Sequence, residues 1–428
     1  MLKLWFLIYN VILIPCLWGF FRVYSLFNSK IREGFSGRKK TFSELEKNSS
    51  LFTNGKKNIL IHSSSFGEFQ QSIPIIQELK KRNVNIIVSF FSPSGFKNSK
   101  IPYENTIKLY LPFDSYFKMK KFFKLLKPDL IILIRYDLWL NFLIRAKKLN
   151  VKTIIANARF DEKDVFWIFP VFRSFKKILF SLIDELFVID DEDKNNYQRI
   201  LNKKSSSVIM MGDSKFERVF EASKNIKKEN VLEEEIILNK KVFVIGSSWK
   251  DDEEMIFPVI DKIAENDSSL LTVLVPHEPK ETKLLLIERN IKEKYKKLNS
   301  IRYSNIKNYK NENLIIVDSI GKLMSLYSQA YVSYVGGGFR SGLHNILEPV
   351  IFNMPVFFSN LVKNSDEDEV LLSSGCGLLV KNKKQFYKIF KEIIDDKELR
   401  DRIGGKCKSV FEKKLGTAKK IVEYLFDS

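Results

Sequence analysis

The chain has 428 residues, 45% of them hydrophobic, which is enough apolar side chain for two cores of roughly 150 to 200 residues each. Its formal net charge is +20, from 71 Lys and Arg against 51 Asp and Glu. No aromatic RNA-binding motif, zinc-finger spacing or arginine-rich arm accompanies this charge, which argues against a nucleic-acid-binding protein. The three Cys form no C-x-x-C pair and there are only three His, so we expect no metal, no other cofactor and a reducing compartment.

The first predicted element is an apolar helix. No charged residue occurs between Leu4 and Phe21, a run just long enough to cross most of a bilayer core. Pro15 and Asn10 within it leave an anchor that lies in the membrane surface as the alternative to a span. The run ends without a small-residue cleavage site, which argues against a signal peptide. We therefore predict a membrane anchor over residues 1–30.

Positive charge follows the apolar run. Only Lys3 precedes it, whereas the residues after it include Arg22, Lys30, Arg32, Arg38, Lys39 and Lys40. The positive-inside rule therefore predicts an inner-membrane protein whose remaining residues face the cytoplasm. The same charge favours an anionic membrane surface as a partner.

Strand and helix patterns alternate through the rest of the chain. Apolar runs typical of buried strands are predicted at 58–63, 84–90, 108–111, 130–134, 151–156 and 185–189, and again at 242–245, 270–275, 314–317, 331–335 and 355–358. Residues 221–240 are charged and carry no strand signal, as expected of a linker. Repeated β-α-β units predict an α/β fold of two Rossmann-like domains facing a cleft, over residues 31–220 and 241–428. In such folds ligands bind at the carboxyl ends of the strands.

One candidate catalytic group follows the first strand. In the segment His62-Ser-Ser-Ser-Phe-Gly67-Glu68, the glycine permits a backbone turn that places Glu68 at the entrance of a helix. Glu68 is then either a general base or a carboxylate that complements the helix dipole. Since the dipole lowers the pKa of a carboxyl group, a base that works near neutral pH needs burial or a nearby carboxylate to raise it.

Other polar residues follow neighbouring strands of the first half. Asp137 and Trp139 are candidates for contact with an acceptor, and a core position is the alternative for Trp139. Arg159 and Lys215 add cations at the same strand ends, either for an anionic substrate or for surface ion pairs.

The second half carries a candidate nucleotide site. A strand stops at Gly336-Gly337-Gly338, and His344-Asn345-Ile346-Leu347-Glu348 then opens a predicted helix. Glycines let backbone amides approach a phosphate, and a carboxylate suits ribose hydroxyls. Further phosphate contacts are predicted at three neighbouring strand ends, by Gly246-Ser247-Ser248, Pro276-His277 and Ile320-Gly321-Lys322. A tight turn and a solvated first-turn carboxylate are the alternative for the glycine run and Glu348.

Taken in order, these motifs resemble the 3-deoxy-D-manno-octulosonic acid (Kdo) transferases, GT-B glycosyltransferases of lipopolysaccharide biosynthesis. The resemblance covers nearly the whole chain, and its specificity comes from the order of the set rather than from any one motif. The set comprises Arg38, His62-x-x-Ser65-x-Gly67-Glu68, Leu111-Pro-Phe-Asp114, Trp139-x-Asn141, Asn157-Ala-Arg159, Gly212-x-x-Lys215-Phe216, Gly246-Ser247, Pro276-His277, Ile320-Gly-x-Leu323-x-x-Leu-Tyr327, Gly336-Gly337 and His344-Asn-x-x-Glu348.

The resemblance implies CMP-Kdo as donor and a lipid A precursor, lipid IVA, as acceptor, with inversion at the anomeric carbon. It implies that Glu68 is the catalytic base, that Lys215 stabilises charge in the transition state, and that Asp137 stands near a family glutamate. The acceptor-binding residues that it implies are Arg38, Ser65, Gly67 and Arg159. The CMP-binding residues that it implies are Gly246, Ser247, Ser248, Pro276, His277, Ile320, Gly321, Lys322, Gly336, Gly337, Asn345, Ile346, Leu347 and Glu348.

The chain departs from the family pattern near Asp137. Many members carry Glu at the positions of Arg135 and Asp137, and Pro at Leu140. With one carboxylate absent, Asp137 is left to support Glu68. Two alternatives remain for the function: a membrane-associated GT-B enzyme that uses a UDP-sugar, and a nucleotide-sugar-binding protein without catalysis. The short loop at Gly246 argues against the first, and the presence of Glu68 argues against the second.

Overall fold

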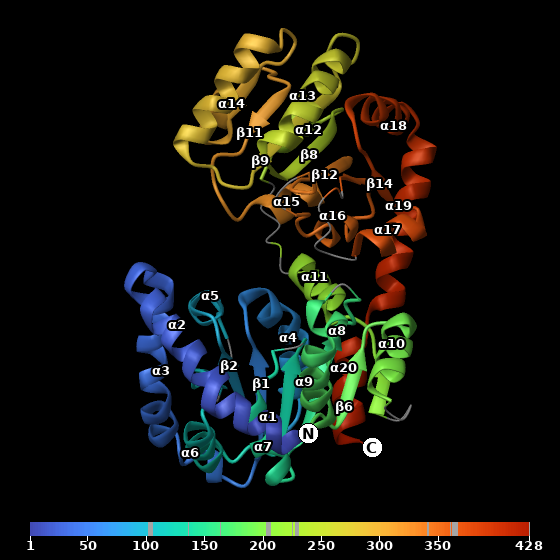
Figure 1. Ribbon diagram of the computed structural model, residues 1–428. Helices are drawn as coiled ribbons and strands as arrows, with labels where there is room; N and C mark the ends of the chain where they lie inside the picture. The colour runs from blue at the N-terminus through green and yellow to red at the C-terminus, as the bar shows by residue number, and fades with distance from the viewer. Residues whose placement is uncertain are drawn as a thin grey trace. The chain divides into compact units, whose positions relative to one another are not determined.

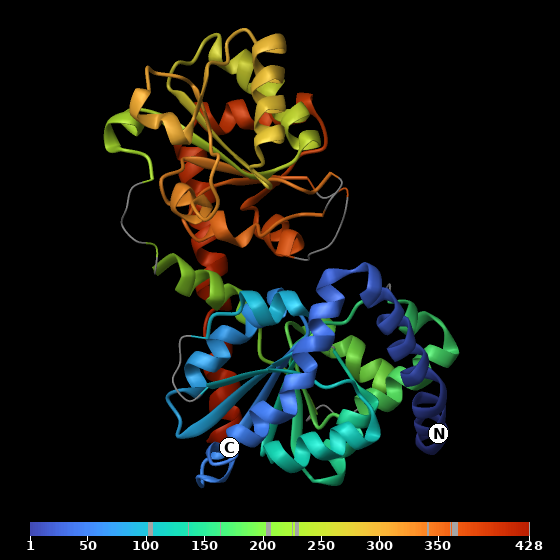
Figure 2. The same ribbon diagram turned by 90° about the vertical axis from the view of Figure 1, so that its left-hand side faces the viewer.

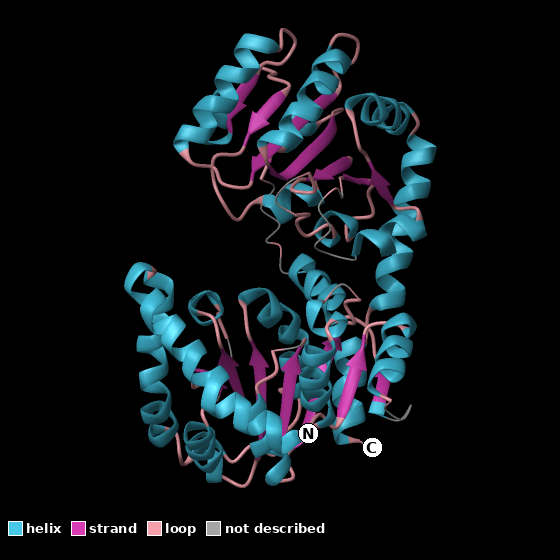
Figure 3. Cartoon of the chain, in the orientation of Figure 1, coloured by secondary structure: helices cyan, strands magenta, loops and turns pink. Residues whose placement is uncertain are grey.

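The computed structural model describes residues 1–101, 106–135, 137–162, 164–202, 207–224, 226, 231–339, 342–359, 361 and 367–427. The chain forms two compact units, which are described separately (Figure 1). Unit 1 comprises Met1–Arg218 and Gly416–Ser428, and unit 2 comprises Val219–Leu415. In each unit helices cover both faces of a central sheet, as Figure 3 shows.

Unit 1 contains a parallel sheet of seven strands in the order β3-β2-β1-β4-β5-β6-β7. The order reverses at β1, which is the Rossmann arrangement. The strands are β1 (Lys57–Ser63), β2 (Val84–Phe90), β3 (Thr106–Tyr110), β4 (Leu130–Ile134), β5 (Lys152–Ala158), β6 (Glu185–Val188) and β7 (Val208–Met210). The connecting helices are α4 (Phe66–Leu79), α5 (Pro93–Asn98), α6 (Tyr116–Leu126), α7 (Leu140–Lys148), α8 (Val165–Ile168), α9 (Pro170–Ser181), α10 (Asp191–Leu201) and α11 (Ser214–Lys224).

Two apolar cores lie on the two faces of this sheet. Alternate residues of β1 point to opposite faces, so Leu60 joins one core and Ile59 and Ile61 join the other. Strands buried on both faces read as continuous apolar runs, which is why the sequence predicts them.

Unit 2 repeats the design with the order β10-β11-β9-β8-β12-β13-β14. Its strands are β8 (Lys241–Ser248), β9 (Leu270–Pro276), β10 (Ser300–Arg302), β11 (Leu314–Ile316), β12 (Val332–Val335), β13 (Val356–Phe358) and β14 (Gly377–Leu379). Its helices are α12 (Glu234–Ile237), α13 (Lys250–Ala264), α14 (Glu281–Lys294), α15 (Leu323–Ser328), α16 (Leu347–Val350), α17 (Glu367–Ser374), α18 (Lys383–Asp395) and α19 (Lys397–Lys414). The predicted pair of Rossmann-like α/β halves is therefore present.

The boundary of the second half needs a correction. The sequence predicts one domain over residues 241–428, whereas Gly416–Ser428 belong to unit 1. The reason is α20 (Thr417–Phe426), whose Ala418, Ile421 and Val422 are buried in the unit 1 core that also holds Ile75 and Ile76 of α4. Of the predicted linker 221–240, residues 225 and 227–230 lie outside the described residues, and the described remainder holds the end of α11 and all of α12.

The N-terminal helices pack on unit 1. Helix α1 (Leu2–Ile8) continues through a π-helical turn, η1 (Tyr9–Leu13), into α2 (Ile14–Phe27), and α3 (Ser29–Lys47) follows. Within Leu2–Phe27 an 18-residue window has a mean hydropathy of 2.0, and by length and composition the helix is long enough to cross a membrane. Tyr9 and Ile14 nevertheless belong to a core cluster of unit 1. Figure 2 shows these helices, in blue, lying against the side of the unit.

Candidate functional site

Glu68 stands in the first turn of α4, directly after β1. Ser65 is the N-cap of this helix, and its Oγ accepts a hydrogen bond from the Glu68 amide at 3.4 Å. Glu68 Oε2 in turn accepts hydrogen bonds from the amides of Ser64 and Ser65. This reciprocal capping box fixes the carboxylate at the carboxyl end of β1. The predicted helix-entrance position of Glu68 is thus confirmed, and Gly67 is exposed beside it.

His62, a buried histidine of the same motif, contacts residues at two other strand ends. His62, at 2% exposure, lies near the end of β1, where it pairs with Ser89 of β2 in the register of the sheet. Its Nδ1 is 2.8 Å from Ser89 Oγ, and its Nε2 is 2.8 Å from Asp137 Oδ2. Sequence reasoning did not assign His62 a role, because its partners lie on two other strand ends.

The pKa of Glu68 is raised above its ordinary value. Burial is the largest cause, and the negative charge of Asp137 adds to it. Hydrogen bonds from the Ser64 and Ser65 amides and the proximity of His62 act in the opposite direction but do not cancel the rise. A raised pKa makes the ionised carboxylate a stronger base. Both conditions that the sequence analysis set for a working base, burial and a nearby carboxylate, are therefore met.

A hydrogen-bond network around Gln71 connects the strand ends next to Glu68. Gln71 Oε1 of α4 accepts hydrogen bonds from Arg135 Nε at 3.3 Å and Asn157 Nδ2 at 3.2 Å. Asn157 Nδ2 also donates to Ser214 Oγ at 2.6 Å. Since Arg159 follows Asn157 and Lys215 follows Ser214, this network positions the two predicted cations at the carboxyl edge of the sheet. The Arg159 carbonyl accepts from Tyr197 at 2.7 Å.

Arg38 and Trp139 take part in packing. The Arg38 guanidinium donates to the carbonyls of Phe91 and Leu111 and lies 4.3 Å over the ring of Phe91. Burial lowers the pKa of Arg38 to about 10. Trp139 stacks on the same Phe91 ring at 4.9 Å and packs on the core, as its alternative interpretation holds. The acceptor contact implied for Arg38 stays a prediction, beside this structural role.

Two further motif residues hold the N-terminal helix. Asp114, fully buried after β3, accepts hydrogen bonds from the amides of Asn141 and Phe142 at the start of α7, each at 2.9 Å. It also accepts from the Tyr9 hydroxyl at 2.8 Å. The Asn141 side chain exchanges hydrogen bonds with that of Asn10 at 2.9 and 3.1 Å. The motifs ending at Asp114 and Asn141 thus attach η1 to the sheet.

In unit 2 the rings of Trp249, His277 and His344 form an aromatic stack, and they come from the segments that follow β8, β9 and β12. The His277 ring, after β9, is 4.7 Å from Trp249 and 4.3 Å from His344. Trp249 Nε1 donates to His344 Nε2 at 3.0 Å. Burial and the neighbouring His277 lower the pKa of His344 to about 4, so this imidazole is neutral near pH 7 and accepts the bond. His277 is exposed and presents its ring to solvent.

The start of α13 differs from the predicted phosphate cradle. Strand β8 continues through Ser248, and Ser248 Oγ donates to buried Glu253 at 2.9 Å. Asp252 Oδ2 accepts hydrogen bonds from the Trp249 amide at 2.9 Å and the Gly337 amide at 3.0 Å. The carboxylate of Asp252, one of three acidic residues in the first turn of the helix, therefore occupies the Gly337 amide of the predicted phosphate-binding glycine run.

Close packing explains several glycines. A Cβ on Gly246 would stand 1.9 Å from the hydroxyl of Tyr327, and one on Gly336 would stand 2.5 Å from the Ser247 carbonyl oxygen. Gly337 and Gly321 have φ of 98° and 85°, a conformation that favours glycine. The glycine run thus has a structural reason, in keeping with its tight-turn interpretation. Residues 340–341 of the loop that follows lie outside the described residues.

The remaining predicted nucleotide residues are split between surface and core. Asn345 Nδ2 donates to Glu348 Oε1 at 3.0 Å, in the first turn of α16. Ile346 and Leu347 are buried, so only their backbone can reach a ligand. Ile320 is 84% exposed, and Lys322 Nζ lies 4.9 Å from the centre of the Tyr303 ring.

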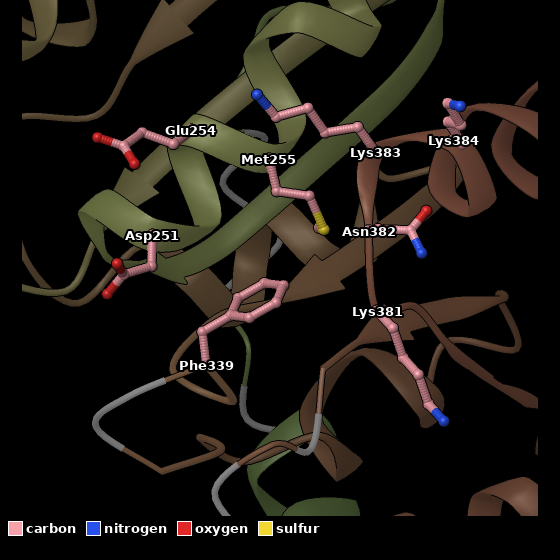
Figure 4. Close-up of a pocket in the computed structure, with 8 residues that line it drawn as sticks. All are labelled: Asp251, Glu254, Met255, Phe339, Lys381, Asn382, Lys383 and Lys384. Carbon is pink, nitrogen blue, oxygen red and sulfur yellow. The ribbon is translucent and has the colours of Figure 1, made fainter.

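A pocket of about 560 Å³ lies beside the glycine run (Figure 4). Asp251, Glu254 and Met255 of α13 line one side, and Phe339 and residues 381–384 line the other. None of these residues is predicted from the sequence as a site residue. Among the described residues no group of three or more His, Cys, Asp or Glu is placed to hold a metal ion.

Solved structures share this fold. UDP-GlcNAc 2-epimerase from Neisseria meningitidis superposes with a TM-score of 0.61 over 86% of this chain and all of its own, at 16% identity. At that identity the likeness shows the fold alone. Together with the two parallel sheets, it defines the GT-B class of two Rossmann-like domains.

Sequence comparison then finds a family model that matches part of the chain and relatives that match most of it. Residues 34–218 match the family model described as 3-deoxy-D-manno-octulosonic-acid transferase. A transferase of that name from Aquifex aeolicus is 28% identical over 81% of this chain and 88% of its own. A bifunctional glycosyltransferase/methyltransferase from Fusobacterium nucleatum is 28% identical over 85% of this chain, which spans only 56% of that protein. The chain is therefore similar to the Kdo transferases, a family of glycosyltransferases, through a domain match over residues 34–218 and relatives that cover most of its length.

Proposed function

We propose that the chain transfers Kdo from CMP-Kdo to a lipid A precursor, lipid IVA, on the cytoplasmic face of the inner membrane. The observation that carries this proposal is Glu68, a half-buried carboxylate of raised pKa beside the His62–Asp137 pair. The names of the chain's relatives supply the substrate class. The product enters lipopolysaccharide biosynthesis.

Glu68 acts as the general base of an inverting displacement. Its carboxylate takes the proton of the acceptor hydroxyl, and the hydroxyl oxygen forms a bond to the anomeric carbon of Kdo. The bond from that carbon to the CMP phosphate oxygen breaks, and CMP leaves with the electron pair. Asp137 keeps the pKa of Glu68 high, and His62 holds Asp137 in place.

Cations and amides stabilise the departing phosphate. Lys215 supplies positive charge from unit 1, at the start of α11. In unit 2, His277, Lys322 and the glycine-rich loop bind CMP, and Glu348 binds the ribose hydroxyls. Asn345 orients Glu348 through their 3.0 Å hydrogen bond. No metal takes part, so a chelator leaves the rate of transfer unchanged.

Arg38, Ser65, Gly67 and Arg159 form the acceptor side. Ser65 and Gly67 flank Glu68 on the same turn, where an acceptor hydroxyl must come to lose its proton. Arg159 offers a charge for the acidic phosphates of a lipid A precursor.

The direct test is the product of an incubation with CMP-Kdo and lipid IVA. Mass spectrometry should show the acceptor heavier by one or more Kdo residues, with CMP released in step. Parallel incubations with UDP-sugars test the alternative enzyme class. Release of UDP with glycosylated lipid, and no CMP from CMP-Kdo, would overturn the proposal. Tight CMP-Kdo binding without turnover would support the binding-protein alternative.

A further inference from the structure

A second exposed apolar surface lies on α8 and α9, outside every predicted site. Phe166, Ile168, Phe169, Val171 and Phe172 are each between 44% and 63% exposed. Their rings cluster, since Phe172 lies 5.3 Å from Phe166 and 6.2 Å from Phe169. A contiguous apolar patch of this kind on a folded surface marks an interaction site.

This patch adjoins the N-terminal apolar helix. The ring of Trp5 of α1 lies 4.8 Å from that of Phe175 of α9, tilted by 42°, and its Nε1 donates to Ser174 Oγ at 3.3 Å. Tyr9 lies 5.8 Å from the same Phe175 ring. Figure 1 shows α1 and α9 side by side on unit 1. The N-terminal segment that meets α9 in this way has exposed apolar residues of its own on α1, η1 and α2, among them Leu4, Leu7, Val11, Phe20 and Val23.

The contacts of Tyr9 and Asn10 decide how this helix meets a membrane. Both residues lie within the stretch Leu2–Phe27, and their side chains bond Asp114 and Asn141 of the folded unit. If the helix spanned a bilayer, these partners would have to sit inside a hydrocarbon core about 30 Å thick, or the buried bonds would break. A helix lying in the membrane surface keeps every one of these contacts.

Positive charge accompanies the apolar surface. Arg173, which follows Phe172, and Lys177 are exposed on α9, and exposed Arg22 interrupts the apolar run of α2. Cations at the rim of an apolar face fit the headgroups of anionic lipids.

We propose that α1, η1 and α2 together with α8 and α9 form one docking surface, which lies in the plane of an anionic lipid leaflet and does not cross it. The surface places unit 1 on the membrane through two segments far apart in the sequence. The inference rests on the membrane location in the proposed function and on no step of the transfer reaction, so vesicle binding tests it independently of activity.

The α8–α9 half is tested with the full-length double variant Phe169→Ser and Val171→Ser. Serine at position 169 is also a favourable N-cap for α9, so the helix should persist. We expect co-sedimentation with vesicles of phosphatidylcholine and phosphatidylglycerol (7:3) to weaken by about tenfold or more, from the apolar area no longer buried. The matched control is Leu285→Ser with Leu286→Ser on α14 of unit 2, where exposure is 53% and 65%; its binding should be unchanged.

Equal vesicle binding by wild type and the α8–α9 variant would overturn the proposal. So would a wild-type dimer in solution that the α8–α9 variant converts to monomer, because the surface would then serve a second copy of the chain.

The in-plane arrangement is tested with a cysteine at each end of the helix. Cys16 is exposed whereas Cys376 and Cys407 are buried, so a Cys16→Ser protein should react little with maleimide before a new cysteine is introduced. In inverted inner-membrane vesicles, an impermeant maleimide should label Lys3→Cys and the control Lys30→Cys alike. Labelling of the cysteine at position 30 only, with that at position 3 protected until detergent is added, would mean that the helix spans the membrane.

Discussion

Burial raises the pKa of Glu68 most, and Asp137, which is distant in sequence, raises it further, while His62 lowers it. The helix dipole alone would lower the pKa of a first-turn carboxyl group, and burial together with Asp137 reverses that direction. Asp137 lies in the loop after β4, and its short side chain comes within 2.8 Å of His62 Nε2. The substitution that distinguishes this chain from the family pattern is therefore compatible with a working base.

We expect Asp137→Asn to move the acid limb of the pH–rate profile. Glu68 works as the carboxylate, so activity rises with pH through its pKa. Removing the negative charge that raises this pKa lowers it, and the limb of kcat/KM should shift to lower pH while the plateau rate falls. Ser89→Ala is the control, because it removes only the other hydrogen bond of His62 and changes no charge. A limb that stays in place in Asp137→Asn would contradict this role.

Gly246 tests whether a glycine serves packing or a ligand. A Cβ at this position would meet Tyr327, whose buried hydroxyl has no hydrogen-bond partner among the described residues. We expect Gly246→Ala to lower the free energy of unfolding by ~2 kcal/mol, measured by thermal denaturation. Adding Tyr327→Phe should restore part of the loss. An unchanged melting temperature with weakened CMP binding would instead mean that Gly246 is needed for backbone approach to the phosphate.

Among the elements, long buried strands are predictable and short edge strands are not. Strands β1, β2, β4 and β9 read as apolar runs because both faces are covered. Strands β7, β10 and β14 have three residues each and lie at sheet edges, whereas β11 and β13, which are as short, lie inside the sheet, are fully buried and read as apolar runs. The sequence also stops β8 at residue 245, whereas the strand continues through Ser248.

The site residues also divide into those that local sequence patterns predict and those whose contacts depend on the fold. Glu68 at a helix entrance and the strand-end positions of the other motifs follow from local patterns. His62 could have been noticed as one of only three histidines, but its pairing with Ser89 and Asp137 depends on the order of the strands. The capping role of Asp252 could have been predicted from the acidic run after Trp249, since carboxylates favour the first turn of a helix.

Helix α20 joins the end of the chain to unit 1 by burial of its apolar face. Ile421 is fully buried in a unit 1 core, so Ile421→Ala should destabilise unit 1 by ~3 kcal/mol in chemical denaturation. Lys420→Ala, at the exposed neighbour, should change stability by no more than about 0.5 kcal/mol. Equal stability of both variants would mean that α20 does not hold to unit 1.

At the scale of the whole molecule, each unit is a complete Rossmann-like body with a distinct part of the chemistry. Unit 1 carries Glu68, the proposed base, and the apolar N-terminal helices, and unit 2 carries the residues proposed to bind CMP. The similarity to Kdo transferases and this distribution of residues agree with the proposed reaction, which uses residues of both units.

The most direct test of the account is Kdo transfer by Glu68→Gln. Glutamine keeps an oxygen that can accept from the Ser64 and Ser65 amides, so the capping box and the fold are preserved while the base is removed. With CMP-Kdo and lipid IVA, the account predicts a loss of transfer of at least about a hundredfold with CMP binding unchanged, measured by product mass and calorimetry. Transfer at the wild-type rate by Glu68→Gln would contradict it.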